Sequence, residues 1–434
     1  MRARTHARRG ALTVAASIAA ASLVVHPAAA VDGSDGGLWY YTATGMEEVH
    51  QTTTGEGIEI ALIDGLMNPA APELAGTNLT VREPSYCAAE AGGAALPATS
   101  DLPAARHTTS VTSMLIGNGV GIAGAPSVRG VAPGASVTVY ARFGTSADDT
   151  CPAIGGSEGP SRAFGDAVSD GADIIVVPGD IDLAVDDYVA AITGGSIVVG
   201  AGGNDGMPVS GWPATLNGAV ATGTVGPGAV LDPGSPTGEG LGVVAPGADI
   251  RSIDPTFTTY GLSTGSSNSA VYTAGALALL WSEYPDATSN QILQALVRTT
   301  DGTEHEPTWD EDYGFGSVHV RQLVASDPMA YPDENPFVSD GADETPAAEE
   351  LLASSADPAP SATTEPGVGG DSADAGDEPA SDEDGSSGIG TIWITLGVVA
   401  VLVIIAVIVV ALLRARARRG SISGTDDQHG GHHG

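Results

Sequence analysis

The uncharged, apolar run at residues 389–413 constrains the fold of this chain more than any other feature of its 434 residues. A helix of that length crosses the hydrocarbon core of a bilayer, which is about 30 Å thick. Arginines gather directly after the run, at residues 414–419, and basic residues beside a membrane span mark its cytoplasmic side. We therefore expect one C-terminal transmembrane helix in the cell membrane. Residues 414–434 would form a cytoplasmic tail, and the large N-terminal part would lie outside the cell.

The N-terminus supports this topology. Residues 2–9 carry several arginines, residues 11–25 are small and apolar, and Ala28 and Ala30 have the spacing of a signal-peptidase site. This order is typical of a secretory signal peptide, which we place at residues 1–30. An uncleaved membrane anchor fits less well because the apolar run is short.

The charge of the chain excludes several functions. It has 53 acidic and 16 basic residues, a formal net charge of -37, and every basic residue is arginine. A nucleic-acid-binding protein needs a basic surface to neutralise phosphates, so we expect no nucleic-acid partner. Chemistry that depends on lysine, such as a Schiff base or a P-loop, is excluded because the chain has no lysine.

The segment at residues 330–388 is rich in Pro, Ala, Ser, Gly, Asp and Glu and has no basic residue. Such a segment has little apolar surface to bury, and its like charges repel one another. We expect it to be an extended, disordered linker to the membrane. This leaves residues 31–329 as the extracellular domain.

Two cysteines, Cys87 and Cys151, lie on the expected outer side of the membrane. Thiols oxidise in that compartment, and two cysteines allow only one pairing, so we expect a disulfide between them. We expect no zinc site here, because two cysteines alone supply too few ligands.

The expected extracellular domain alternates between strand-like and helix-like patterns. Short apolar runs rich in β-branched residues lie at residues 58–63, 137–140, 174–177 and 196–199. Helical patterns lie at residues 110–116, 162–168, 185–192, 270–284 and 291–298. The last helix is preceded by Thr288-x-x-Gln291, the spacing of a capping box. We therefore expect an α/β fold with a mostly parallel central sheet flanked by helices, and a site at the carboxyl ends of the strands.

Four polar residues stand at the boundaries of these elements. Asp64 ends the first apolar run and His107 opens a helix. Asn204 follows a buried strand, and Ser267 comes just before a long apolar helix. Taken singly, each is explained as a turn or capping residue. Together they supply an acid, a base, an oxyanion donor and a hydroxyl, the groups that acyl transfer requires.

The motifs around these residues resemble those of the subtilisin-like serine proteases, the subtilases. Gly55-Glu-Gly-Ile-Glu-Ile-Ala-Leu-Ile-Asp64 is similar to the aspartate block of the family, and Arg106-His107-Thr-Thr stands where the family has His-Gly-Thr. Gly265-Ser-Ser267 occupies the place of Gly-Thr-Ser. The resemblance implies a subtilisin-like fold and a serine endopeptidase acting on proteins or peptides. It also implies a triad of Asp64, His107 and Ser267, with Asn204 as the oxyanion donor.

The order of the segments adds a second resemblance. A signal peptide, a subtilase-like domain, an acidic Pro-rich linker and one C-terminal membrane helix are similar to the arrangement of the mycosins. These are membrane-anchored subtilases associated with type VII secretion. The resemblance implies membrane components of such a secretion system as partners.

Several residues depart from the family pattern. Asp64 is followed by Gly-Leu, and His107 by Thr108 where the family has glycine, so that a bulkier residue could shift the imidazole. The segment expected to line the substrate reads Val176-Val-Pro178-Gly-Asp, and proline has no N–H to offer a peptide. A second interpretation is therefore a catalytically weakened subtilase that serves as a structural or docking component of a secretion complex.

One serine motif in the chain points to a different hydrolase class. Gly261-Leu-Ser263-Thr-Gly265 matches the nucleophile motif of α/β-hydrolases, but in that class the acid and the histidine follow the serine. Too little of the domain remains after Ser263 to supply them. No loop shows a recognisable spacing of calcium ligands, so we assign no metal site and no cofactor, although the resemblance leaves structural calcium open.

Overall fold

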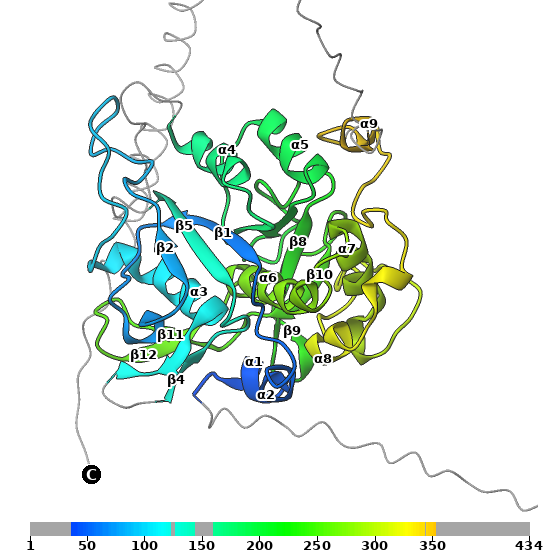
Figure 1. Cartoon of the computed structure of the whole chain (residues 1–434), viewed down its shortest axis with the longest axis horizontal. Coiled ribbons are helices and arrows are strands. Elements are labelled where there is room, and N and C mark those ends of the chain that lie inside the picture. The colour runs from blue at the N-terminus through cyan, green and yellow to red at the C-terminus, as the bar shows by residue number, and fades with distance from the viewer. Residues whose placement is uncertain (1–35, 123–125, 144–158, 343, 353–434) are drawn as a thin grey trace, which may run out of the picture. The chain divides into compact units, whose positions relative to one another are not determined.

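The computed structural model describes residues 36–122, 126–143, 159–342 and 344–352 (Figure 1). The expected signal peptide, membrane span and cytoplasmic tail lie outside these residues, as does Cys151. Within the described part of the chain, no helix has the length and apolar character needed to span a bilayer. The expected topology therefore stays a prediction.

An eight-stranded sheet with the order β10-β8-β7-β6-β1-β5-β2 forms the centre of the fold, and β9 pairs with β8 at its side. All pairings are parallel except that of β9 with β8. The strands are β1 (Glu59–Gly65), β2 (Leu79–Val81), β5 (Ser136–Phe143), β6 (Ile174–Val177), β7 (Ile197–Ala201), β8 (Val220–Gly226), β9 (Val230–Leu231) and β10 (Val243–Pro246). Two antiparallel hairpins lie outside this sheet, β3 (Asn118–Val120) with β4 (Pro126–Arg129) and β11 (Ile250–Ile253) with β12 (Tyr260–Ser263).

Helices cover both faces of the sheet because its strands are apolar on both sides. Ile60 and Leu62 of β1 belong to the larger core, together with residues of α3 (Arg106–Ile116), α6 (Ser266–Glu283) and α7 (Ser289–Arg298). Ala61 and Ile63 point to the opposite core, which α4 (Arg162–Ser169) and α5 (Val185–Thr193) complete. This alternation along one strand is the period of two that a pleated strand imposes. Figure 1 shows α4 and α5 on one side of the strands and α6 on the other.

Shorter helices complete the described part of the chain. They are α1 (Trp39–Thr42), α2 (Met46–Val49), α8 (Val320–Val324) and α9 (Ala348–Leu352). Single 3-10 turns lie at Pro72–Leu74, Pro103–Ala105, Gly159–Ser161, Pro227–Ala229, Thr300–Gly302 and Pro328–Ala330.

The structure confirms each expected strand and helix; β6 has the expected bounds, and the other elements differ at one or both ends. α3 starts at Arg106 and α6 at Ser266, so His107 and Ser267 both lie in the first turn of a helix. The capping box before α7 is present: the side chain of Thr288 accepts from the N–H of Gln291, and the Gln291 side chain accepts from the N–H of Thr288.

The expected boundary at residue 329 was wrong. Part of the predicted linker, residues 330–352, packs on the domain instead. The ring of Phe337 lies 5.6 Å from that of Phe315, Leu351 is buried in the core beside α5, and Asn217 donates to the carbonyl of Ser339 at 3.0 Å. The sequence did not predict this packing, because the average composition of residues 330–388 is polar and acidic although residues 330–352 include a few apolar side chains. We call residues 330–352 the C-terminal extension.

Candidate active site

Asp64 and His107 form a direct hydrogen bond at the carboxyl edge of the sheet. Asp64 is the last residue but one of β1, and its side chain is 7% exposed. His107 lies in the first turn of α3, and its Nδ1 is 2.7 Å from Oδ2 of Asp64. The His107 side chain is 43% exposed, so the imidazole joins a buried carboxylate to the surface. A carboxylate in this position fixes the ring orientation and favours the tautomer with a proton on Nδ1.

Ser267 lies in the first turn of α6, directly after Gly265 and Ser266. Its Oγ donates a hydrogen bond to the carbonyl of Pro178 at 2.8 Å. Pro178 follows β6, which is the neighbour of β1 in the sheet. The hydroxyl therefore lies at the carboxyl end of β6.

Asn204 is exposed in the loop after β7. Its Oδ1 accepts a hydrogen bond from the N–H of Ser266 at 2.7 Å. Because the carbonyl end of the carboxamide is held in this way, the Nδ2 end is the one that can donate to a ligand. The N–H of Ser267 is also in the first turn of α6, where main-chain N–H groups have no helical acceptor.

The register of the sheet brings the two halves of the site together. β1 pairs with β6 so that Leu62 lies opposite Val176. Two residues further along, the same register places Asp64 level with Pro178, whose carbonyl Ser267 contacts. Neighbouring strands are about 4.8 Å apart. The structure thus places all four predicted residues at the carboxyl edge of the sheet as two linked pairs: Asp64 is bonded to His107, and Asn204 is joined to Ser267 through Ser266.

Three contacts at this edge were not predicted from the sequence. The bond from Ser267 to Pro178 is one, and the bond between Thr108 and Gly65 is another. The third is Asn268, which is buried and donates through Nδ2 to the carbonyl of Gly247 at 2.9 Å and to Oγ of Ser263 at 3.1 Å. Apart from the bond between Asn268 and Ser263, these contacts join residues more than twenty positions apart, so local sequence patterns carry no signal for them.

Ser263 does not have the geometry of an α/β-hydrolase nucleophile. It ends β12, a strand of a separate antiparallel hairpin, whereas that motif requires a turn from a strand of the central sheet into a helix. Its Oγ contacts the carbonyl of Ile250 and the side chain of Asn268. The structure therefore gives Ser263 a role in the turn before α6.

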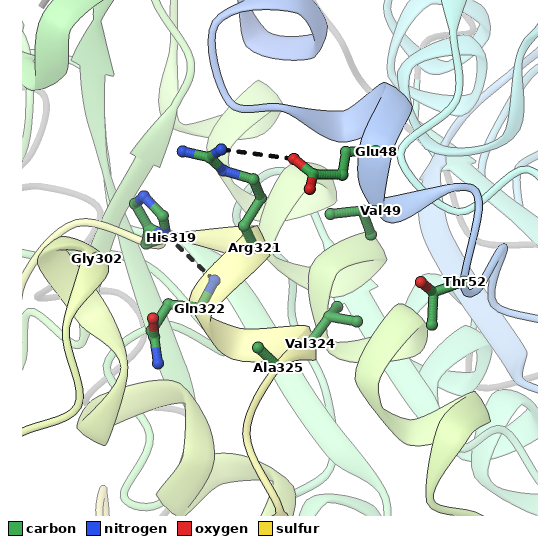
Figure 2. A pocket seen from close by; sticks show the side chains of 9 residues that line it. All are labelled: Glu48, Val49, Thr52, Gly302, His319, Arg321, Gln322, Val324 and Ala325. Atoms are coloured by element: carbon green, nitrogen blue, oxygen red, sulfur yellow. Dashed lines mark hydrogen bonds and ion pairs between the residues drawn. The ribbon is translucent and has the colours of Figure 1, made fainter.

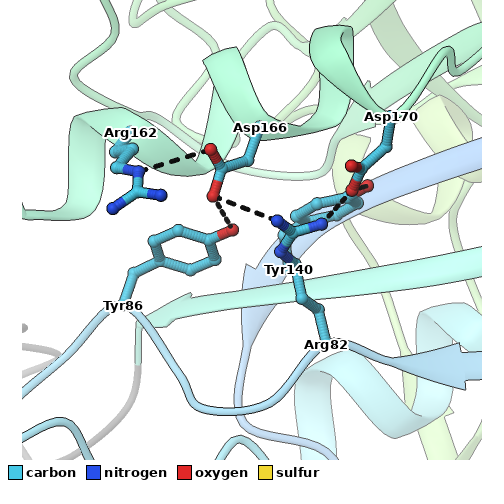
Figure 3. Close-up of polar contacts among 6 residues, drawn as sticks. All are labelled: Arg82, Tyr86, Tyr140, Arg162, Asp166 and Asp170. Carbon is cyan, nitrogen blue, oxygen red and sulfur yellow. Dashed lines mark hydrogen bonds and ion pairs between the residues drawn. The ribbon is translucent and has the colours of Figure 1, made fainter.

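The loop that carries Cys87 is fixed to α4 by a polar cluster (Figure 3). Arg82 pairs with Asp166 and Asp170, and the hydroxyl of Tyr86 donates to Asp166 at 2.8 Å. Burial raises the pKa of Tyr86, and the bond to the Asp166 carboxylate raises it further. Cys87 itself is buried, and no cysteine is free in the described part of the chain. Since Cys151 lies outside that part, the pairing stays a prediction.

Several hollows lie away from these four residues. One of about 530 Å³ opens between α2 and α8, where Glu48 and Arg321 approach to 3.6 Å (Figure 2). None of its lining residues belongs to the predicted site. Among the described residues, no group of three or more His, Cys, Asp or Glu side chains could hold a metal ion.

The sequence of the chain matches the profile of a known family, and it is also similar to individual proteins. The subtilase family profile matches residues 55–316. Subtilisin E of Bacillus subtilis is 29% identical over 263 residues, which are 57% of this chain and 62% of that protein. An extracellular protease of Xanthomonas campestris is 27% identical over 230 residues, 50% of this chain and 39% of the relative. The chain thus spans less than two thirds of the length of these relatives.

Solved structures share the fold. MycP1 from the ESX-1 type VII secretion system matches with a TM-score of 0.51 at 18% identity, covering 69% of this chain and 88% of that one. Fervidolysin from Fervidobacterium pennivorans, a keratinolytic enzyme related to subtilisin, matches with a TM-score of 0.52 at 22% identity. The match covers 67% of this chain and 46% of that one. At these identities the likeness shows a common fold.

Proposed function

Since the chain belongs to the subtilase family, we propose that it is a membrane-anchored extracellular serine endopeptidase with Asp64, His107 and Ser267 as its catalytic triad. The observation that carries the proposal is the 2.7 Å bond between Asp64 and His107. It lies at the same edge of the sheet as the Ser267 hydroxyl. An acid, an imidazole and a hydroxyl at one edge are the groups that an acyl-enzyme mechanism uses.

In this mechanism Oγ of Ser267 attacks the carbonyl carbon of the scissile peptide bond while His107 takes the hydroxyl proton. Asp64 orients the imidazole and stabilises the imidazolium that forms. Nδ2 of Asn204 and the N–H of Ser267 stabilise the oxyanion of the tetrahedral intermediate. His107 then protonates the leaving amine, and water, activated by the same imidazole, hydrolyses the acyl-enzyme.

The contact between Ser267 and Pro178 sets a condition on the first step. The hydroxyl proton is donated to the Pro178 carbonyl, so it must leave that acceptor before His107 can receive it. A substrate bound along the end of β6 offers a main-chain N–H to the same carbonyl. Such an N–H would take the place of the serine hydroxyl.

The location and partners belong to the proposal as well. The arginines after residues 389–413 and the signal-peptide pattern support a domain held outside the cell. The fold shared with MycP1, together with the order of segments, supports an association with membrane components of a type VII secretion system. Proteins or peptides near the membrane would then be the substrates.

A fluorophosphonate probe on the full-length protein in membranes tests the reaction. We expect labelling of the wild type and of Ser263→Ala, the matched control, because Ser263 only supports the turn before α6. Ser267→Ala should lose the label. Folded wild-type protein without label would contradict the endopeptidase. It would favour the second candidate, a structural or docking subtilase, which the altered residues beside Asp64 and His107 support.

A further inference from the structure

The residue after His107 makes a second connection between the strand of the acid and the helix of the base. Oγ1 of Thr108 accepts a hydrogen bond from the N–H of Gly65 at 3.0 Å. Gly65 follows Asp64, just as Thr108 follows His107. Two adjacent hydrogen bonds therefore join β1 to α3, one between the side chains of the pair and one beside it.

This second bond falls where the sheet is irregular. β1 pairs with β5 in register up to Asp64, opposite Ala141, and then shifts so that Gly65 lies opposite Phe143. A shift of this kind disrupts the ladder and redirects the adjacent side chain. At this point the Thr108 hydroxyl supplies an acceptor to the main chain directly after Asp64.

Both members of the Thr108–Gly65 bond are buried. Thr108 has no exposed surface, and Gly65 is buried. A buried N–H without an acceptor is costly, and water cannot replace Thr108 without a rearrangement of the chain. The bulk of Thr108, expected to disturb the imidazole, is thus accommodated in the interface between α3 and β1.

The neighbouring hydroxyls hold α3 in place around this contact. Oγ1 of Thr109 accepts from the N–H of Asn68 at 2.9 Å. Oγ1 of Thr112 donates to the carbonyl of Thr108 at 2.6 Å, within the helix. The first turn of α3 and the chain after β1 therefore form one hydrogen-bonded unit.

We propose that Thr108 is a positioning residue: its hydroxyl fixes the main chain at Gly65 and so keeps the Asp64 carboxylate aligned with His107. The inference rests on the proposed function, because alignment matters only if the pair is catalytic. Loss of alignment acts on the chemical step more than on substrate binding. A misplacement of about 1 Å at a catalytic group can lower the rate by about 100-fold.

The test compares Thr108→Val, Thr108→Ser and Thr112→Val in the full-length protein. Thr112→Val is the matched control, since it makes the same change at an equally buried position whose hydroxyl bonds only within the helix. We expect Thr108→Val to lower kcat on a peptide substrate by about 10- to 100-fold with little change in KM. Thr108→Ser should restore kcat, and Thr112→Val should keep it. Thr108→Ala, which favours a helix, replaces the valine variant if that variant does not fold.

Two readouts do not depend on turnover. The low-field proton resonance of the Asp64–His107 bond should weaken, and the amide of Gly65 should exchange faster, in Thr108→Val but not in Thr112→Val. Equal kcat and equal spectra in the two valine variants would overturn the inference. An inactive wild type would refute the proposed function alone, and loss of the resonance only in Thr108→Val would still support positioning.

Discussion

Asn217→Ala should weaken the packing of the C-terminal extension on the domain and make the extension open more often. The carboxamide of Asn217 makes three hydrogen bonds to the extension: Nδ2 donates to the carbonyls of Ser339 at 3.0 Å and Pro346 at 3.1 Å, and Oδ1 accepts from the N–H of Ser339 at 2.8 Å. Asn217 is 4% exposed. Alanine removes all three bonds and leaves the main-chain contacts of residue 217 in place.

The magnitude follows from these bonds. Each contributes about 0.5–1.5 kcal/mol net, so the three together stabilise the docked extension by about 1.5–4.5 kcal/mol. When the extension opens, its carbonyls are exposed to water. The loss of stability is therefore confined to this segment, and the rest of the domain stays folded. Every 1.4 kcal/mol is a factor of ten, so we expect exchange in the extension to accelerate roughly ten-fold to a thousand-fold.

Hydrogen exchange followed by mass spectrometry measures this effect on the full-length protein. Peptides from residues 333–352 should exchange faster in Asn217→Ala, and peptides from α6 should not change. Asn290→Ala is the control, because it loses one exposed bond, from Nδ2 to Asp333 at 3.0 Å. Unchanged exchange in residues 333–352, or equal acceleration in α6, would refute local docking by Asn217.

Three further outcomes are expected. Asn204→Ala should lower kcat by about 100- to 1,000-fold at a nearly constant KM in a peptide assay, because its Nδ2 is expected to contact only the oxyanion; a higher KM with normal kcat would contradict this role. Burial lowers the pKa of His50, so the unfolded chain binds more protons near the ordinary histidine pKa and stability should fall as the pH drops from about 7 to 5. His50→Gln should flatten that slope in urea denaturation, and an unchanged slope would refute the assignment. Hydrogen bonds from Thr256, Thr259 and Thr258 lower the pKa of Asp254 to about 2. The contribution of Asp254 to the stability of the fold is therefore present above about pH 4 and is lost as the pH falls towards 2. Asp254→Ala should remove that part of the acid unfolding transition. An acid unfolding curve identical to that of the wild type would contradict a contribution of Asp254 to stability.

The predictable features of the fold were those encoded locally. The runs of Ile and Val that form β1, β6 and β7 carry their strand signal in consecutive residues. The capping box that begins at Thr288 is likewise contained in four consecutive residues. The pairing of Asp64 with His107 was predicted through the family motifs, because their positions at a strand end and a helix start do not by themselves fix a distance.

The features that were missed depend on distant partners. The composition of the C-terminal extension is polar and acidic, which is typical of a linker. Its contacts with the domain, such as the bonds from Asn217, come from residues far earlier in the chain. From the sequence, Thr108 is only a bulkier residue beside His107. Its hydroxyl accepts from the N–H of Gly65, at the point where the register of β1 and β5 shifts, and that contact is visible only in the structure. Neither feature has a periodicity or a motif of its own.

The helix that carries the proposed nucleophile in its first turn passes through the interior of the domain. From Ser266 to Trp281, every residue of α6 except Ser267 is buried. No hinge or lid can carry Ser267 away while this helix keeps its place. Heat should therefore extinguish catalysis and melt the domain in a single event, and residual activity after a temperature jump would serve as a direct gauge of how many molecules remain native.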